Sequence, residues 1–146
     1  MRNRTLLSRL ERHQAETLAV LDRAARLLGG DPGVARDGLA ALRWELARRL
    51  REYQIFKHRE IFEPAIASGS PSLAAAGRRL KADCIAGGEG FQRYLREWGG
   101  RDVAAQWPAF KAATVALGAS LRDHVDAEGV QIRLLLAEGD KARRAA

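Results

Sequence analysis

The chain has 146 residues, with 47% hydrophobic residues, 29% charged residues and a formal net charge of +7. This length and balance fit one globular domain with a single core and argue against a disordered, fibrous or membrane-embedded chain. The single cysteine, Cys84, excludes a disulfide within the chain and a multi-cysteine metal cluster, while abundant Ala, Leu, Arg and Glu favour helices.

Four amphipathic helices are predicted, and the first runs from about residue 4 to residue 28. Its inward positions recur every three or four residues, which is the spacing of one helix face. These positions are Leu6, Leu10, His13, Thr17, Leu21, Ala24 and Leu28. The segment 29–33, Gly-Gly-Asp-Pro-Gly, is expected to end the helix, because glycine closes helices and proline cannot continue them.

The second helix is predicted from about residue 34 to residue 67. Its inward positions are expected to be Leu39, Leu42, Leu46, Leu50, Gln54, His58, Ile61 and Ala65. Pro64 is expected to bend or end this helix, since its ring clashes with the carbonyl of Glu60. Ser70 followed by Pro71 then predicts the N-cap and the first residue of the third helix.

The third helix, residues 72–98, is predicted to be continuous although it contains three glycines. Its inward positions are Leu73, Gly77, Leu80, Cys84, Gly87, Phe91, Tyr94 and Trp98. Each of Gly87, Gly88 and Gly90 costs about 1 kcal/mol relative to alanine in a helix. The apolar stripe nevertheless keeps its register through them, which favours one weakened helix over two short ones. Cys84 is expected to pack as a small buried hydrophobe.

The fourth helix is predicted to begin at Trp107 and Pro108. Its inward positions are Phe110, Thr114, Leu117, Leu121, His124, Glu128, Ile132 and Leu135. Short connections between long helices predict an all-α fold, an up-down-up-down antiparallel four-helix bundle over residues 1–139. Residues 140–146 are predicted to be a frayed basic tail.

All three histidines of the chain fall on the inward stripe of a different predicted helix. At a rise of about 1.5 Å per residue, His13, His58 and His124 lie at similar depths in the bundle. Gln54 and Glu128 fall at the same level. Imidazoles and a carboxylate that point into a bundle are what a metal ion needs. The sequence therefore predicts one polar layer inside the core.

The chain resembles the hemerythrin-like (HHE cation-binding) domains in three features. These are four antiparallel helices, a histidine on the first helix, and the His-x-x-x-Glu step from His124 to Glu128 on the fourth. The ending Ile61-Phe62-Glu63-Pro64 of the second helix is similar to that family as well. The aromatic residues that support the resemblance are Phe91, Tyr94, Trp98, Trp107 and Phe110. The resemblance implies a hemerythrin-like bundle, and family members with all ligands hold two bridged irons and bind or sense dioxygen.

The departures from the family pattern argue against a di-iron centre and against reversible oxygen binding. The second helix has Gln54-x-x-x-His58 where the family has His-x-x-x-Glu, and Gly129 stands where an acidic residue is usual. The third helix offers no histidine at the matching level, between Cys84 and Gly87. Too few ligands are left for two metals.

Two interpretations of the layer stay open. In one, His13, His58, His124 and Glu128 hold a single divalent ion, iron or zinc, with Gln54 as a weak further ligand. In the other, the layer is metal-free, and Glu128 pairs with a histidine or an arginine, because a buried carboxylate without a partner becomes neutral. The missing ligand on the third helix favours the metal-free layer.

These interpretations correspond to two functions: a sensor or storage protein for one metal ion, and a metal-free interaction or regulatory module that docks on a protein partner. No nucleophile elbow, phosphate loop or dinucleotide motif occurs, so an enzyme is not expected. A homodimer or an acidic protein partner is expected, and nucleic acid is not, because acidic residues are interspersed with the arginines. Neither a secretory signal nor an apolar run of membrane-spanning length is recognised, so a cytoplasmic protein is predicted.

Overall fold

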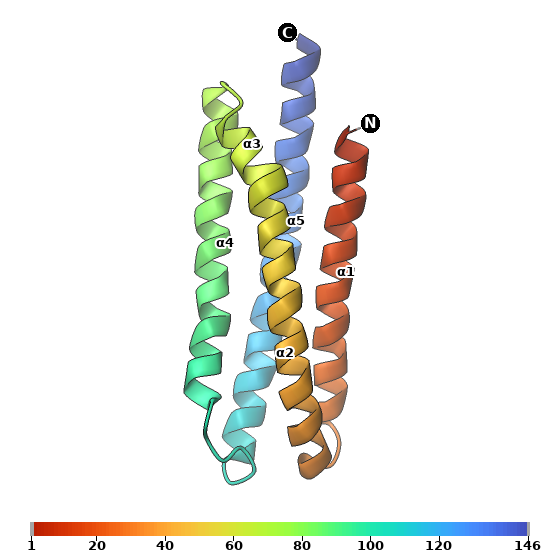
Figure 1. The fold of residues 1–146 in the computed structure, drawn as a ribbon, viewed down its shortest axis with the longest axis vertical. Helices are drawn as coiled ribbons and strands as arrows, with labels where there is room; N and C mark the ends of the chain where they lie inside the picture. Colours follow the sequence, from red (N-terminus) through yellow and green to blue (C-terminus); the bar gives the residue numbers. More distant parts are fainter. Residues whose placement is uncertain (1, 146) are drawn as a thin grey trace.

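The computed structural model of the chain describes residues 2–145, which form a bundle of helices with no strand among them. Its four long helices are α1 (Arg2–Leu28), α2 (Pro32–Lys57), α4 (Pro71–Trp98) and α5 (Trp107–Ala145). Figure 1 shows both termini at one end of the bundle and the α1–α2 and α4–α5 connections at the other. The predicted all-helical fold is confirmed. None of the described helices combines the length and the apolar character that are needed to cross a membrane.

Two N-caps explain where α2 and α4 begin: the cap at Ser70 was predicted, whereas the cap at Asp31 was not. The Asp31 carboxylate accepts hydrogen bonds from the backbone N–H groups of Gly33 and Val34 at 3.1 and 3.2 Å. The Ser70 hydroxyl accepts one from the N–H of Leu73 at 3.3 Å. Proline follows each cap, where its missing N–H has no partner to lose.

Pro64 changes the type of helix rather than only bending it. After α2 the chain makes one turn of π-helix, η1 (His58–Phe62), and then the short α3 (Glu63–Ile66). In η1 the N–H of Glu63 donates to the carbonyl of His58, five residues back. The wider turn carries one extra residue, which relieves the clash between a proline ring and the carbonyl four residues before it.

The glycines of α4 do not break the helix, as predicted. A side chain at Gly87 would place its Cβ 2.9 Å from the imidazole of His124 on α5, and one at Gly77 would lie 3.1 Å from the carbonyl oxygen of Phe62. Glycine therefore lets the neighbouring chain approach α4 closely. The packing gained in this way offsets the low helix propensity.

The C-terminal tail is a correction to the prediction. Residues 140–145 are not frayed, because α5 continues to Ala145, and residue 146 lies outside the described part of the chain. The Arg143 guanidinium lies 2.5 Å from the Asp140 carboxylate one turn earlier. Arg143 and Arg144 also lie in the last turn, where positive charge interacts favourably with the helix dipole.

Three hydrophobic clusters fill the bundle from one end to the other. The one toward the termini is the largest, and its buried members are Leu6, Leu10, Tyr53, Phe56, Ile61, Phe62, Leu73, Leu80, Cys84, Val125, Ile132 and Leu135. Lys57 and Glu128 are also buried, at 2% and 4% exposure. Charged residues are almost never fully buried unless they are paired, so this end of the bundle contains the candidate site.

Candidate functional site

An ion pair between α2 and α5 lies inside the bundle. Lys57 Nζ donates to Glu128 Oε1 at 2.6 Å, and the two side chains are only 3% and 1% exposed. The same ammonium lies 3.8 Å from the centroid of the Tyr53 ring, whose face attracts a cation. Removing two charges from water costs several kcal/mol per ion. The short hydrogen bond and the aromatic face are the contacts that offset this cost.

His124 approaches the second oxygen of the same carboxylate. Its Nε2 lies 3.5 Å from Glu128 Oε2, one helical turn away on α5. That distance is long for a hydrogen bond, and within the described chain this buried oxygen accepts none. Burial acts to raise the pKa of Glu128, but the nearby His124 and the Lys57 ammonium together outweigh burial and lower it. The carboxylate is therefore ionised at neutral pH.

Tyr53 and Cys84 complete the layer as neutral groups. Gln14 Nε2 on α1 donates to the Tyr53 hydroxyl at 3.3 Å. Burial raises the pKa of Tyr53, and the Glu128 charge adds to that effect. Burial also raises the pKa of the Cys84 thiol, which is 2% exposed, as predicted for a small buried hydrophobe. A protonated phenol and a protonated thiol thus surround the charged pair.

The structure brings together only two of the predicted ligands, His124 and Glu128. His13 instead lies between α1 and α2, with its ring 4.9 Å from the Phe56 ring and 5.8 Å from the Tyr53 ring. Burial is the main reason that the pKa of His13 is lowered, which keeps the imidazole neutral.

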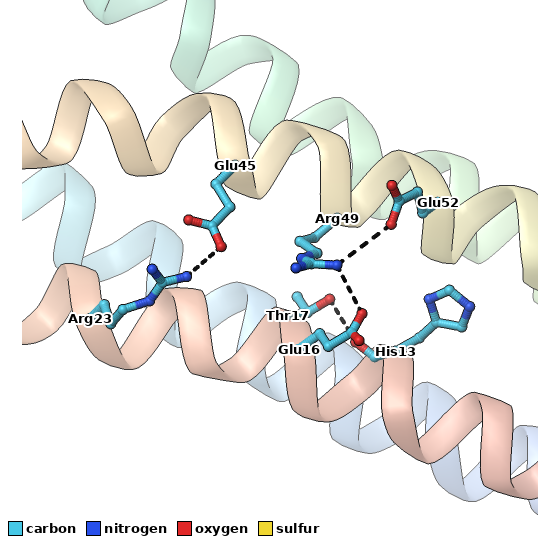
Figure 2. A network of polar contacts seen from close by, with 7 residues as sticks. All are labelled: His13, Glu16, Thr17, Arg23, Glu45, Arg49 and Glu52. Atoms are coloured by element: carbon cyan, nitrogen blue, oxygen red, sulfur yellow. Dashed lines mark hydrogen bonds and ion pairs between the residues drawn. The ribbon is translucent and has the colours of Figure 1, made fainter.

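Figure 2 shows the surroundings of His13 at the α1–α2 interface. Arg49 of α2 reaches Glu16 of α1 at 3.1 Å and Glu52 of its own helix at 3.8 Å. No marked contact reaches the imidazole of His13 itself, whose backbone carbonyl accepts a hydrogen bond from Thr17 at 2.9 Å. His13 is therefore a packing residue between two helices.

Gln54 of α2 and His58, the first residue of η1, lie away from this interface. The ring centroids of His58 and Phe62 lie 5.2 Å apart in an edge-to-face arrangement. Burial lowers the pKa of His58 most, and the charge of Lys57 lowers it further. Gln54 packs against the backbone of α4, where a Cβ at Gly88 would come within 2.7 Å of its amide nitrogen. Both residues line an open groove between α2 and α4.

These positions do not bring the predicted ligands together as one group. Within residues 2–145, no group of three or more His, Cys, Asp or Glu side chains is placed to hold a metal ion. His13, His58 and His124 do not converge, and one oxygen of Glu128 is bonded by Lys57. The single-ion site is thus not assembled from the residues that the stripes suggested, although the polar layer itself is present.

Sequence reasoning missed Lys57 and Tyr53 because it followed the wrong face of α2. Successive four-residue steps from Leu46 to His58 each rotate the stripe by about 40°, since a helix turns about 100° per residue. Alternating steps of four and three residues lead from Leu46 through Leu50 to Tyr53 and Lys57, which are the buried positions. This alternation was the signal available in the sequence.

Glycines make room for the long polar side chains of the layer. A Cβ at Gly129 would lie 2.7 Å from the Gln14 amide, just as those at Gly87 and Gly88 would collide with His124 and Gln54. Contacts shorter than 3.0 Å would force a neighbour to move. The absence of a side chain at Gly129 therefore lets the Gln14 side chain pack against α5 while its amide donates to the Tyr53 hydroxyl.

A comparison of the chain with family models, with curated proteins and with solved structures finds no match. The central fact of the chemistry of this site is a buried ammonium beside Glu128, the carboxylate that one of the two interpretations assigned to a metal ion.

Proposed function

We propose that this chain is a metal-independent binding or regulatory module with a hemerythrin-like, up-down-up-down design, neither an oxygen carrier nor an enzyme. The observation that supports the proposal is the 2.6 Å hydrogen bond from Lys57 Nζ to Glu128 Oε1 among buried side chains. A lysine ammonium supplies, at this carboxylate, the positive charge that a metal ion would otherwise supply.

The position of Lys57 disfavours a metal at Glu128 on electrostatic grounds. A divalent cation bound to this carboxylate would lie within a few ångströms of the ammonium, and like charges repel strongly in a buried setting. Metal binding would require Lys57 to move or to lose its proton, because ligands and their neighbours must accommodate the added charge. The two remaining histidines lie too far off to compensate, since they belong to no common ligand group.

The competing function is a protein that binds one metal ion at His124 and Glu128. One observation favours it: Glu128 Oε2 is buried and accepts no hydrogen bond from the described residues, with the imidazole of His124 3.5 Å away. A carboxylate oxygen and an imidazole in this arrangement are two of the ligands that zinc or iron uses. The two further ligands of a four-coordinate ion would have to come from groups that do not lie beside Glu128 in this structure.

Elemental analysis separates the two functions. The protein is purified without chelators and without nickel affinity resin, and its iron and zinc content is measured. We expect far less than one equivalent of either metal, in the wild type and in His124→Ala alike. Stoichiometric iron or zinc that is lost in His124→Ala, but retained in the matched control His13→Ala, would overturn the proposal and establish the competing function.

A further inference from the structure

A large apolar cavity lies toward the end of the bundle opposite the termini, away from the polar layer. It has a volume of about 610 Å³, is partly open to solvent and is lined by all four long helices. Protein interiors contain few voids larger than a water molecule, whereas ligand sites occupy roughly 300–1,000 Å³ and are mostly apolar. The volume and lining of this cavity are those of a ligand site.

Small residues keep the cavity open, and apolar side chains form most of its wall. The small residues that line it from the helices are Ala24, Ala25, Ala40, Gly118 and Ala119. A Cβ at Gly118 would meet no atom within 4 Å, so this position faces open space. The Tyr94 hydroxyl and the Thr114 hydroxyl are hydrogen-bonded to each other at 2.7 Å, so the wall presents few unmet polar groups.

Four arginines and one carboxylate, Asp102, line the cavity, so the charge of the lining is positive on balance. Two of the arginines have carboxylate partners: Arg122 pairs with Asp22, and Arg36 lies 3.4 Å from Asp37. Two others, Arg43 and Arg101, line the same cavity but pair with no carboxylate within the described chain.

The two unpaired arginines lie next to aromatic residues of the cavity wall. The Arg101 guanidinium lies 5.3 Å from the centroid of the Trp98 ring. Burial raises the pKa of Tyr94, and the nearby charge of Arg43 opposes that effect. A guanidinium binds a carboxylate through two parallel hydrogen bonds. Each of the two guanidinium groups can therefore bind an anion at the wall of an otherwise apolar site.

We propose that this cavity binds a single-chain amphipathic carboxylate, a fatty acid, with its hydrocarbon tail among the four helices and its carboxylate at Arg43 and Arg101. The proposal supplies a ligand class for the binding role proposed above, but it does not depend on the state of Lys57 and Glu128. A negative ligand titration would leave the metal analysis unchanged, and metal at His124 would leave this site unchanged.

Calorimetric titration with laurate below its micellar concentration tests the proposal. We expect saturable binding of one molecule per chain, and a Kd that tightens about fourfold per added methylene from octanoate to laurate, the effect of burying about 0.8 kcal/mol per CH₂. Dodecyltrimethylammonium has the same tail with the opposite charge, and it is expected to bind at least about tenfold more weakly. Absence of saturable laurate binding, or equal affinity for the two amphiphiles, would overturn the proposal.

Two matched pairs of variants locate the ligand. Gly118→Leu fills the cavity and improves helix propensity, so it should fold and yet weaken laurate binding by about tenfold or more. Its control is Gly90→Leu, at a second glycine whose Cβ would meet no atom within 4 Å but which does not line the cavity. Arg43→Gln should weaken laurate by about tenfold but not dodecanol, with the exposed Arg48→Gln as control. Unchanged laurate affinity in Gly118→Leu, or in both Arg43→Gln and Arg101→Gln, would refute the placement.

Discussion

Removal of Lys57 alone tests the central feature of the core. Lys57→Met keeps most of the side-chain volume but leaves the Glu128 carboxylate, 1% exposed, with only the imidazole of His124 at 3.5 Å. Breaking a buried pair by removing one partner costs about 3–5 kcal/mol. Because domains of this kind are stable by about 5–15 kcal/mol, the variant should lose a large share of its stability while remaining folded.

The double variant Lys57→Met with Glu128→Leu should behave very differently from the single one. It removes both charges together, and replacing a buried pair by hydrophobic residues is often neutral or stabilising by about 1–4 kcal/mol. The effects of Lys57→Met and Glu128→Leu are therefore expected to be strongly non-additive.

Urea unfolding followed by far-UV circular dichroism measures these free energies, with the slope of the transition compared among variants. Lys81→Met is the matched control, because Lys81 forms an equally short pair with Glu63 at the surface. Its unfolding midpoint should remain close to that of the wild type. A loss below about 1 kcal/mol in Lys57→Met, or a double variant as unstable as the sum of the single ones, would refute the assignment of the buried pair.

Three further outcomes follow from the geometry of the bundle. Burial lowers the pKa of His13 and His58 below the ordinary value of 6.5, so the unfolded chain binds more protons just below that pH. The contribution of these two histidines to stability is complete above about pH 6.5 and declines as the pH falls toward the lowered pKa values. The urea midpoint of the wild type should therefore fall between pH 7.5 and pH 5, and it should fall less when His13 and His58 are both replaced by Gln. An equal fall in the double variant would contradict this assignment. Gly87→Ala places a Cβ 2.9 Å from the imidazole of His124 on α5 and should destabilise the protein by about 1–3 kcal/mol. Gly90→Ala adds a Cβ that meets no atom within 4 Å, so it should stabilise the protein by up to about 1 kcal/mol. Thermal unfolding of the two variants checks the sign of each effect. Cys84 is buried with a raised pKa, so a thiol reagent should modify it only as fast as the chain opens, and rapid modification of the native protein would show an accessible thiol.

The sequence predicted the helices and their inward faces where the periodicity was unbroken. The stripe of α4, from Leu73 to Trp98, and the cap at Ser70 are confirmed, because these signals depend on local backbone geometry and on the period of a helix. The polar position of Glu128 was also visible, since a carboxylate interrupts an otherwise apolar face of α5.

The partner of that carboxylate was decided by the tertiary structure. Beyond Leu46, the inward face of α2 depends on how the helix packs against its neighbours, and a local pattern does not distinguish a three-residue from a four-residue step there. A lysine is normally assigned to the surface, and the buried position of Lys57 becomes favourable only when Glu128 from a distant part of the chain and the Tyr53 ring lie against it. Local sequence thus determines which helices form, while the pairing of charges between helices depends on their rotation and depth in the assembled bundle.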